Sequence, residues 1–359
     1  MTSALTYLRP LLAVAAAVLL VDASTSPAAA AAPPAAAAAT TTTAATAAMK
    51  LPPVLVGAKR VVFLGDSITH AGRWIAYVET YLRTHVPDFN SEFIAVGLPS
   101  ETVSGLSEEG HAGGAFPRPT VHERLERVLA ATKPDVVVAC YGMNCGIYHP
   151  LGDERFQKYR EGMELLRKRC ADVGAKVVHL TPPVFDAEPI RDRTLPAGQT
   201  DYRRPYVGYD DVLAHYSDWL VSKRTSADGS AGWDVVDVHG PMLAFLKAHR
   251  AADPKYRLAG DGVHPNDIGQ WLIARPLLVH WGASAEVATA DDGDKLLAAS
   301  KNGKEILALI ITRQNLLRDA WLTKTGHKRP GVKPGLPLDE AEAKAKDLNA
   351  KIAELQPAK

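Results

Sequence analysis

Residues 61–69 read Val-Val-Phe-Leu-Gly-Asp-Ser-Ile-Thr, an apolar run that ends in a glycine and two polar residues. The run Val61–Leu64 has the length and composition of a β-strand buried on both faces of a parallel sheet. Ser67 then stands just past the carboxyl end of that strand, where open parallel sheets bind their ligands. This stretch predicts an α/β fold with a hydroxyl nucleophile at the functional edge of its sheet.

Further strands and helices alternate along the chain after this stretch. Four more apolar runs are candidate strands: Glu92–Val96, Asp135–Cys140, Lys176–Leu180 and Trp233–Val236. Helical spacing of apolar residues marks Arg73–Thr84, His122–Thr132, Glu154–Val173, Asp210–Lys223 and a helix from about Asn266 towards His280. This alternation predicts a five-stranded parallel sheet covered by helices on both faces, over residues 53–283.

The pattern changes after Ser284. Residues 291–323 form one amphipathic helical pattern, and residues 339–355 form a second, rich in Ala, Glu and Lys. Pro330, Pro334 and Pro337 separate the two. We expect residues 284–359 to be a helical extension that packs on the main domain.

The N-terminus has the features of an export signal. Arg9 precedes the apolar stretch Leu11–Val21, and small residues follow it, which predicts a signal peptide over residues 1–23. Residues 24–52 are mostly Ala, Thr and Pro, a composition typical of a disordered linker. The prediction is a secreted or periplasmic protein with no membrane attachment after cleavage. An uncleaved membrane anchor is the alternative.

Charge and cysteine usage exclude several other classes. The formal net charge is +1, and basic and acidic residues are interspersed, so the chain lacks the basic footprint of a nucleic-acid-binding protein. There are three cysteines, an odd number, so at least one thiol has no partner within the chain. A Cys140–Cys145 bridge is conceivable, although strand geometry would resist it. No spacing resembles a zinc site, and we expect no cofactor.

Polar residues follow several of the predicted strands at the same edge of the sheet. Ser67 follows the first strand, Gly97 the second and Asn144 the third, and Asp261 and His264 come after the fifth strand and its helix. In acyl transfer, Ser67 would attack a carbonyl, His264 would act as general base and then acid, and Asp261 would orient His264. The backbone N–H groups of Ser67 and Gly97 and the side-chain amide of Asn144 would form an oxyanion hole.

Each of these residues also has a simpler explanation when it is taken alone. Ser67 could cap the helix after the first strand, and Gly97 could be a turn glycine with positive φ. Asn144 and Asp261 could be ordinary turn residues, and His264 a loop or packed histidine. The chemical interpretation rests on all five residues reaching one edge of one sheet.

The sequence blocks at this edge resemble those of the SGNH hydrolases, also called the GDSL esterase/lipase superfamily. They are Gly65-Asp-Ser67-Ile-Thr69, Gly97, Gly142-Met-Asn144 and Asp261-Gly-Val-His264-Pro-Asn266, in this order. The resemblance implies a flavodoxin-like three-layer α/β/α sandwich and a metal-free mechanism with catalytic Ser67, His264 and Asp261. It also implies an oxyanion hole of Ser67, Gly97 and Asn144. One departure is Cys145, which follows Asn144 where many members have aspartate.

The sequence says less about the substrate. The insertion Ser100–Pro119 borders the expected site, so Glu101 and Arg118 could contact a sugar-like alcohol, or could belong to a solvated loop. Tyr141 and Tyr148 flank Asn144 and could line the cleft or simply pack there.

Exported proteins that resemble this one often remove acetyl groups from carbohydrates, so the resemblance implies a short-chain esterase acting on a small-molecule or glycan ester. The alternatives are an O-acyltransferase, a lipase or thioesterase with the same triad, and a non-catalytic glycan-binding protein.

Overall fold

The computed structural model describes residues 49–199, 204–226 and 232–356. The predicted signal peptide, most of the predicted linker and the last residues of the predicted extension lie outside these ranges. Met49 and Leu51 already pack against the core, and the Met49 N–H donates to the His85 carbonyl at 3.0 Å. The packed part of the chain therefore includes residues that we had placed in the linker.

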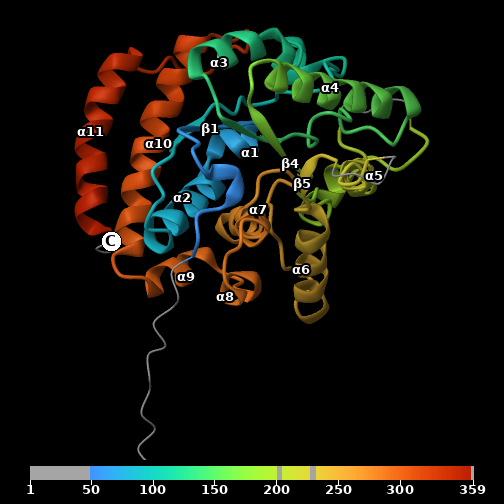
Figure 1. The fold of residues 1–359 in the computed structure, drawn as a ribbon. Coiled ribbons are helices and arrows are strands. Elements are labelled where there is room, and N and C mark those ends of the chain that lie inside the picture. The colour runs from blue at the N-terminus through green and yellow to red at the C-terminus, as the bar shows by residue number, and fades with distance from the viewer. Residues whose placement is uncertain (1–48, 200–203, 227–231, 357–359) are drawn as a thin grey trace, which may run out of the picture. The chain divides into compact units, whose positions relative to one another are not determined.

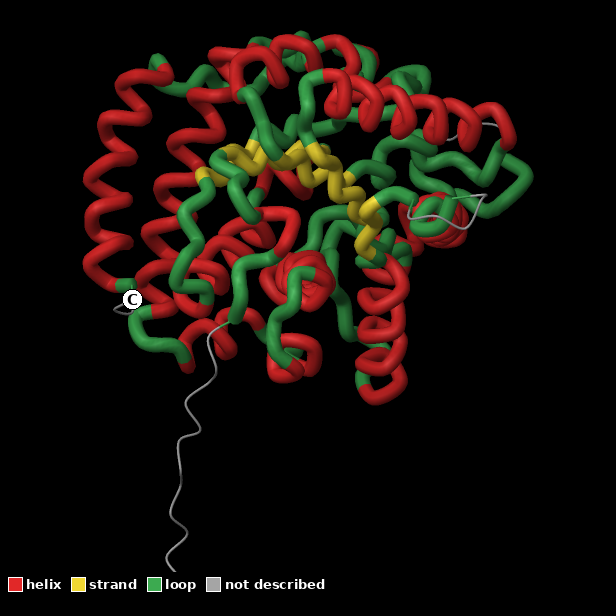
Figure 2. The backbone as a smooth tube through the Cα atoms, viewed as in Figure 1, coloured by secondary structure: helices red, strands yellow, loops and turns green. Residues whose placement is uncertain are grey.

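A single parallel sheet organises the fold, as Figures 1 and 2 show. Its strands are β1 (Arg60–Gly65), β2 (Glu92–Ala95), β3 (Val136–Cys140), β4 (Lys176–Leu180) and β5 (Asp234–Val236). They lie in the order β2-β1-β3-β4-β5 and every neighbouring pair is parallel. The strand order reverses between β1 and β3, and in open α/β sheets such a reversal is where ligands bind.

Helices cover both faces of the sheet, which confirms the predicted three-layer α/β/α sandwich with a flavodoxin-like strand order. In Figure 1, α3 and α4 lie on one side of the strands, and α2 and α7 lie on the other. The helices of the main domain are α1 (Ser67–Ala71), α2 (Arg73–His85), α3 (Leu125–Thr132), α4 (Asp153–Asp172), α5 (Tyr209–Ser222), α6 (His239–Ala252) and α7 (Asp267–His280). Short 3-10 turns occur at Pro53–Leu55, His111–Gly114, Val121–Glu123 and Glu188–Arg193.

Burial on both faces explains why the strands are continuous apolar runs. Every residue of Val61–Leu64 and Val136–Ala139 is fully buried, as expected for central strands with helices above and below. The start of α7 was also predictable: Asn266 caps this helix by accepting from the Gly269 N–H at 2.9 Å, directly after Pro265. The predicted helix over 122–132 begins instead as a 3-10 turn, and α3 proper starts at Leu125.

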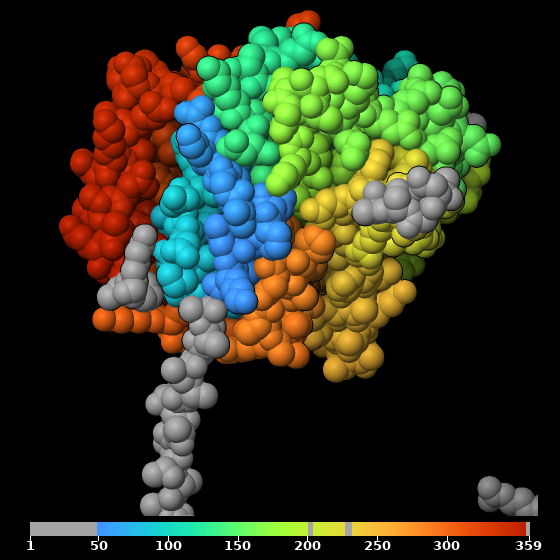
Figure 3. All heavy atoms as spheres, viewed as in Figure 1, coloured from blue at the N-terminus to red at the C-terminus, as the bar shows by residue number. Residues whose placement is uncertain are grey.

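The C-terminal extension consists of α8 (Ala285–Thr289), α9 (Gly293–Ala299), α10 (Gly303–Thr325) and α11 (Leu338–Leu355). The single helix that we predicted over 291–323 is wrong, because the chain turns between α9 and α10, where Asn302 has a left-handed φ of 59°. The extension shares the core of the main domain, with Ile306, Trp321 and Ile352 in the same cluster as the strands. Figure 3 shows the red C-terminal helices directly against the cyan α2 segment.

No helix in the part of the chain that the structure describes is long and apolar enough to cross a membrane.

Candidate active site

Ser67 is the first residue of α1, immediately after β1. Asp66 caps this short helix, because its carboxylate accepts the Ile68 N–H at 2.9 Å, so the helix begins one residue after the strand ends. Gly65 makes the tight turn possible, since a Cβ there would lie 2.1 Å from Thr69 Oγ1 and 2.7 Å from the Cys140 carbonyl. Ser67 is therefore the first helical residue rather than the cap, and its side chain is partly exposed.

Ser67, His264 and Asp261 are linked in that order by two short contacts, one to each ring nitrogen of His264. His264 Nε2 lies 2.9 Å from Ser67 Oγ, and His264 Nδ1 lies 2.7 Å from Asp261 Oδ2. An ionised carboxylate only accepts, so Nδ1 carries the proton in this pair and Nε2 is left free to accept from the serine hydroxyl. This is the order of contacts that a serine nucleophile, a base and an orienting acid require.

Asp261 also builds the turn that presents His264. Its Oδ1 accepts the backbone N–H groups of Val263 at 3.0 Å and His264 at 2.8 Å. Burial alone would raise the pKa of Asp261, but the hydrogen bonds from His264 and Val263 lower it overall, so this carboxyl group is ionised at neutral pH. The side chains of His264 and Asp261 are 53% and 54% exposed, which leaves the pair open to water.

Gly97 lies against α1. The Leu98 N–H donates to the Gly65 carbonyl at 2.9 Å, and His70 Nδ1 bonds the Gly97 carbonyl at 3.1 Å. A Cβ on Gly97 would lie 2.5 Å from the His70 backbone nitrogen, so glycine is required by the close approach of two backbones. Gly97 does not have positive φ, so the turn-glycine alternative is wrong.

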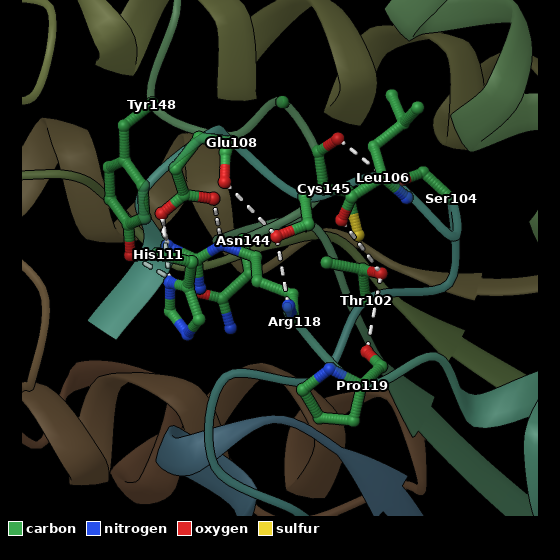
Figure 4. A network of polar contacts seen from close by, with 12 residues as sticks. Thr102, Ser104, Leu106, Glu108, His111, Arg118, Pro119, Asn144, Cys145 and Tyr148 are labelled. Atoms are coloured by element: carbon green, nitrogen blue, oxygen red, sulfur yellow. Dashed lines mark hydrogen bonds and ion pairs between the residues drawn. The ribbon is translucent and has the colours of Figure 1, made fainter. Parts of the chain in front are cut away.

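Asn144 follows β3 and is buried, with its side-chain oxygen held by two donors. Arg118 Nη1 donates to Asn144 Oδ1 at 2.9 Å, and the Tyr148 hydroxyl donates to the same oxygen at 3.1 Å. The Asn144 Nδ2 group donates one hydrogen to the Glu101 carbonyl at 3.2 Å, and its second N–H is not used in that bond. Figure 4 shows Arg118, Tyr148 and Glu108 gathered around Asn144.

The structure places all four residues that we had assigned to substrate binding in hydrogen bonds within the protein, and for the buried Glu101 and Tyr141 the assignment is wrong. Glu101 and Tyr141 are almost completely buried and bond each other, with the Tyr141 hydroxyl 2.6 Å from Glu101 Oε2. Arg118 and Tyr148 both bond Asn144, and only 6% of the Arg118 side chain is exposed. All four therefore belong to a polar network behind Asn144, because residues 101–104 and the Arg118 side chain fold inward, whereas residues 112–115 between them are exposed.

Sequence reasoning did not single out Asp66 or Arg124. Burial raises the pKa of Asp66 to about 6, against lowering contributions from the Ile68 N–H and from His264. The position of Asp66 between a predicted strand and a predicted helix was the sequence signal that could have identified it as a helix cap. Arg124 is fully buried against Glu101, and no sequence signal marks it, because arginine at the start of a helix is ordinarily solvated.

The three cysteines, Cys140, Cys145 and Cys170, are all buried free thiols, so the conceivable Cys140–Cys145 bridge is not formed. Within the ranges that the structure describes, no group of three or more His, Cys, Asp or Glu side chains is placed to hold a metal ion.

Comparison with known proteins gives one family match. Residues 63–272 match the model of the GDSL-like Lipase/Acylhydrolase family. No curated protein matches the chain in sequence.

Solved structures match this chain at low identity and with TM-scores below 0.5. A catalytic mutant of an acetylxylan esterase from Geobacillus stearothermophilus is 19% identical, with a TM-score of 0.45, over 63% of this chain and 95% of that chain. A gut microbial diltiazem-metabolizing enzyme is 20% identical, with a TM-score of 0.48, over 62% of this chain. The match spans about half of that enzyme's own length, 47%.

Proposed function

Because this chain belongs to the GDSL-like lipase/acylhydrolase family, whose members are carboxylic ester hydrolases, we propose that it is an exported serine esterase that removes acetyl groups from carbohydrate. The observation that carries the proposal is the contact chain in which His264 Nε2 lies 2.9 Å from Ser67 Oγ while Asp261 holds the other ring nitrogen. Export rests on the signal-peptide pattern of residues 1–23.

The reaction proceeds through a covalent acyl-enzyme. Ser67 Oγ attacks the ester carbonyl carbon while His264 takes the hydroxyl proton, and the oxyanion forms against the N–H groups of Ser67, Gly97 and Asn144. His264 gives the proton to the leaving alcohol oxygen as the carbon–oxygen bond breaks. A water molecule, deprotonated by His264, then attacks the acyl group and releases the acid and free Ser67.

Solvent exposure supports hydrolysis over acyl transfer. A transferase must keep water from the acyl-enzyme, whereas half of the His264 side chain is open to solvent.

The surface around the site supports a short acyl group. Among the described residues, the exposed large hydrophobic side chains are Val56, Leu151, Leu165, Val173 and Val279. None of them belongs to the segments 65–72, 97–101, 141–148 and 258–266 that carry the site, where a long acyl chain would need apolar surface.

The test is acetate release from acetylated xylan together with the hydrolysis of p-nitrophenyl esters of increasing chain length. We expect fast acetate release that Ser67→Ala abolishes and that the matched surface variant Ser222→Ala leaves unchanged. Preference for long chains would reassign the protein as a lipase or thioesterase. Acetyl transfer to a sugar hydroxyl without net hydrolysis would reassign it as a transferase, and turnover that survives Ser67→Ala would overturn the mechanism.

A further inference from the structure

Each of the two amides that follow β2 and β3 at the site has its oxygen bonded to a buried arginine. Arg124 Nη2 donates to the Val96 carbonyl at 2.7 Å, and this carbonyl belongs to the same peptide group as the Gly97 N–H. Arg118 Nη1 donates to Asn144 Oδ1 at 2.9 Å, the oxygen of the side-chain amide whose nitrogen is the third donor. Two arginines from separate segments thus contact the two amides in the same way.

A glutamate holds each arginine in place. Arg124 bonds Glu101 through two nitrogens, at 2.6 and 2.7 Å, and neither side chain is exposed. Arg118 bonds Glu108 through two nitrogens, both at 2.6 Å. Such bidentate pairs fix the plane of the guanidinium group, so the remaining N–H has one direction in which to donate.

These bonds fix where the amide N–H groups point. In a trans peptide the C=O and N–H bonds are antiparallel, so a Val96 carbonyl directed at Arg124 turns the Gly97 N–H away from Arg124. Arginine has no acceptor, so the Asn144 atom facing Arg118 must be the oxygen, and the NH₂ group lies on the opposite side.

The backbone beside Asn144 is strained in a way that serves the same contact. Ile147 and Tyr148 have left-handed φ values of 50° and 58°, which cost free energy for residues with a Cβ, most of all for a β-branched one. The Tyr148 carbonyl accepts the Tyr206 N–H at 2.8 Å, and the Tyr148 hydroxyl reaches Asn144 Oδ1. Figure 4 shows Tyr148 and Arg118 in the same polar network as Asn144.

We propose that Arg118 and Arg124 are positioning residues of the oxyanion hole, which orient the Asn144 and Gly97 donors and strengthen them through charge-assisted bonds to the amide oxygens. A cation on the oxygen of an amide withdraws electron density from its N–H and makes that N–H a stronger donor. Donors that are already oriented need no reorganisation when the oxyanion forms. Glu101 links the two halves, because its carboxylate holds Arg124 while its carbonyl accepts from Asn144.

This proposal rests on the proposed esterase function, and the decisive variant is Arg118→Met. We expect kcat for p-nitrophenyl acetate to fall about tenfold with KM nearly unchanged, less than the 100-fold or more of losing a whole donor. Affinity for a boronic acid that forms a tetrahedral adduct with Ser67 should fall by the same factor, while affinity for acetate should not change. Arg118→Lys should recover part of kcat, because it keeps the charge.

Arg60→Met is the matched control. Arg60 also bonds one glutamate and one carbonyl, Glu92 at 3.3 Å and Thr132 at 3.1 Å, but it lies at the start of β1, the opposite edge of the sheet. We expect its kcat to equal that of the parent. Tyr148→Phe, which removes only one donor to Asn144 Oδ1, should lower kcat a few-fold and remains informative where an arginine variant does not fold.

Folded Arg118→Met and Tyr148→Phe proteins with parental kcat and boronate affinity would overturn the proposal, as would an equal loss in Arg60→Met. Failure of the esterase function has a different signature, namely turnover that persists in Ser67→Ala.

Discussion

We expect the substitution Asp66→Asn to stabilise the folded protein at alkaline pH and to lower its kcat. Asp66 is 3% exposed, and burial raises the pKa of its carboxyl group from 3.8 to about 6. Asparagine keeps the oxygen that accepts the Ile68 N–H, now at 2.9 Å, and so keeps the cap of α1. The substitution therefore removes a buried charge with little change of shape.

The direction of this change in stability follows from the raised pKa of Asp66. The folded protein binds this proton more tightly than the unfolded chain, so the stability from this group is fully present below pH 3.8 and is lost as the pH rises through about 6. A shift of about 2 pKa units corresponds to about 3 kcal/mol at pH 8. Asparagine has no charge to bury, so we expect Asp66→Asn to be more stable than the parent by up to about 3 kcal/mol at pH 8, and by under about 1 kcal/mol at pH 4.

Urea unfolding of both proteins at pH 4 and pH 8 measures this difference. Asp292→Asn is the control, since Asp292 also caps a helix, accepting the Lys295 N–H at 3.1 Å. Burial acts to raise the pKa of Asp292, but bonds from Lys295 lower it overall, so its stability contribution is present above the unfolded pKa and lost at lower pH. Asp292→Asn should therefore lose stability at pH 8. Equal effects of Asp66→Asn at the two pH values, or a larger destabilisation at pH 8, would refute the reasoning.

The same substitution should cost activity. The charge of Asp66 interacts favourably with a protonated His264, the form that stabilises the transition state. We expect kcat of Asp66→Asn at pH 8 to fall several-fold, so that stability and rate change in opposite directions. An Asp66→Asn protein that is more stable and has the parental kcat would contradict the role of the Asp66 charge in the reaction.

Three further predictions concern packing and thiols. Gly97→Ala should lower both kcat and stability, the latter by about 1–3 kcal/mol, because the new Cβ would lie 2.5 Å from the His70 nitrogen; unchanged kinetics and urea midpoint would contradict this. Burial raises the pKa of Cys145 and of Cys170 to about 12 and that of Cys140 well above its usual value, so iodoacetamide at pH 8 should label none of them until urea is added. Cys145→Ala should keep most of the esterase activity.

The sheet was predictable because its strands are buried on both faces. The central strand β1 is apolar and buried from Val61 to Leu64 and was predicted within a residue of its bounds. Lys176–Leu180 was predicted at its observed bounds because its last three residues are buried, although Lys176 is exposed. The prediction of one helix over residues 291–323 was wrong because it relied on apolar periodicity alone. Apolar periodicity continues through α9 and α10, and our prediction followed it across the Asn302-Gly303 pair, which is itself a turn signal. In the structure Asn302 is left-handed and Gly303 lies close to the Leu297 carbonyl.

The four polar residues of the site and Gly97 were predictable from their positions in the chain. A parallel sheet brings the carboxyl ends of its strands to one edge, so residues that follow different strands, such as Ser67 and Asn144, can be placed at the same edge from their positions in the chain. The spacing of Asp261 and His264 within one turn is likewise a local property of the chain.

The sequence by itself thus determined the strands, the strand ends and the residues that stand there, because these follow from burial and chain order. Tertiary structure alone decided that Glu101 and Arg118 point inward, and that Arg124 carries a buried charge behind Gly97. Charged side chains are ordinarily solvated, and whether one is buried depends on a partner distant in the chain that supplies the compensating charge and hydrogen bonds. Such pairing is set by how segments pack, which no local pattern records.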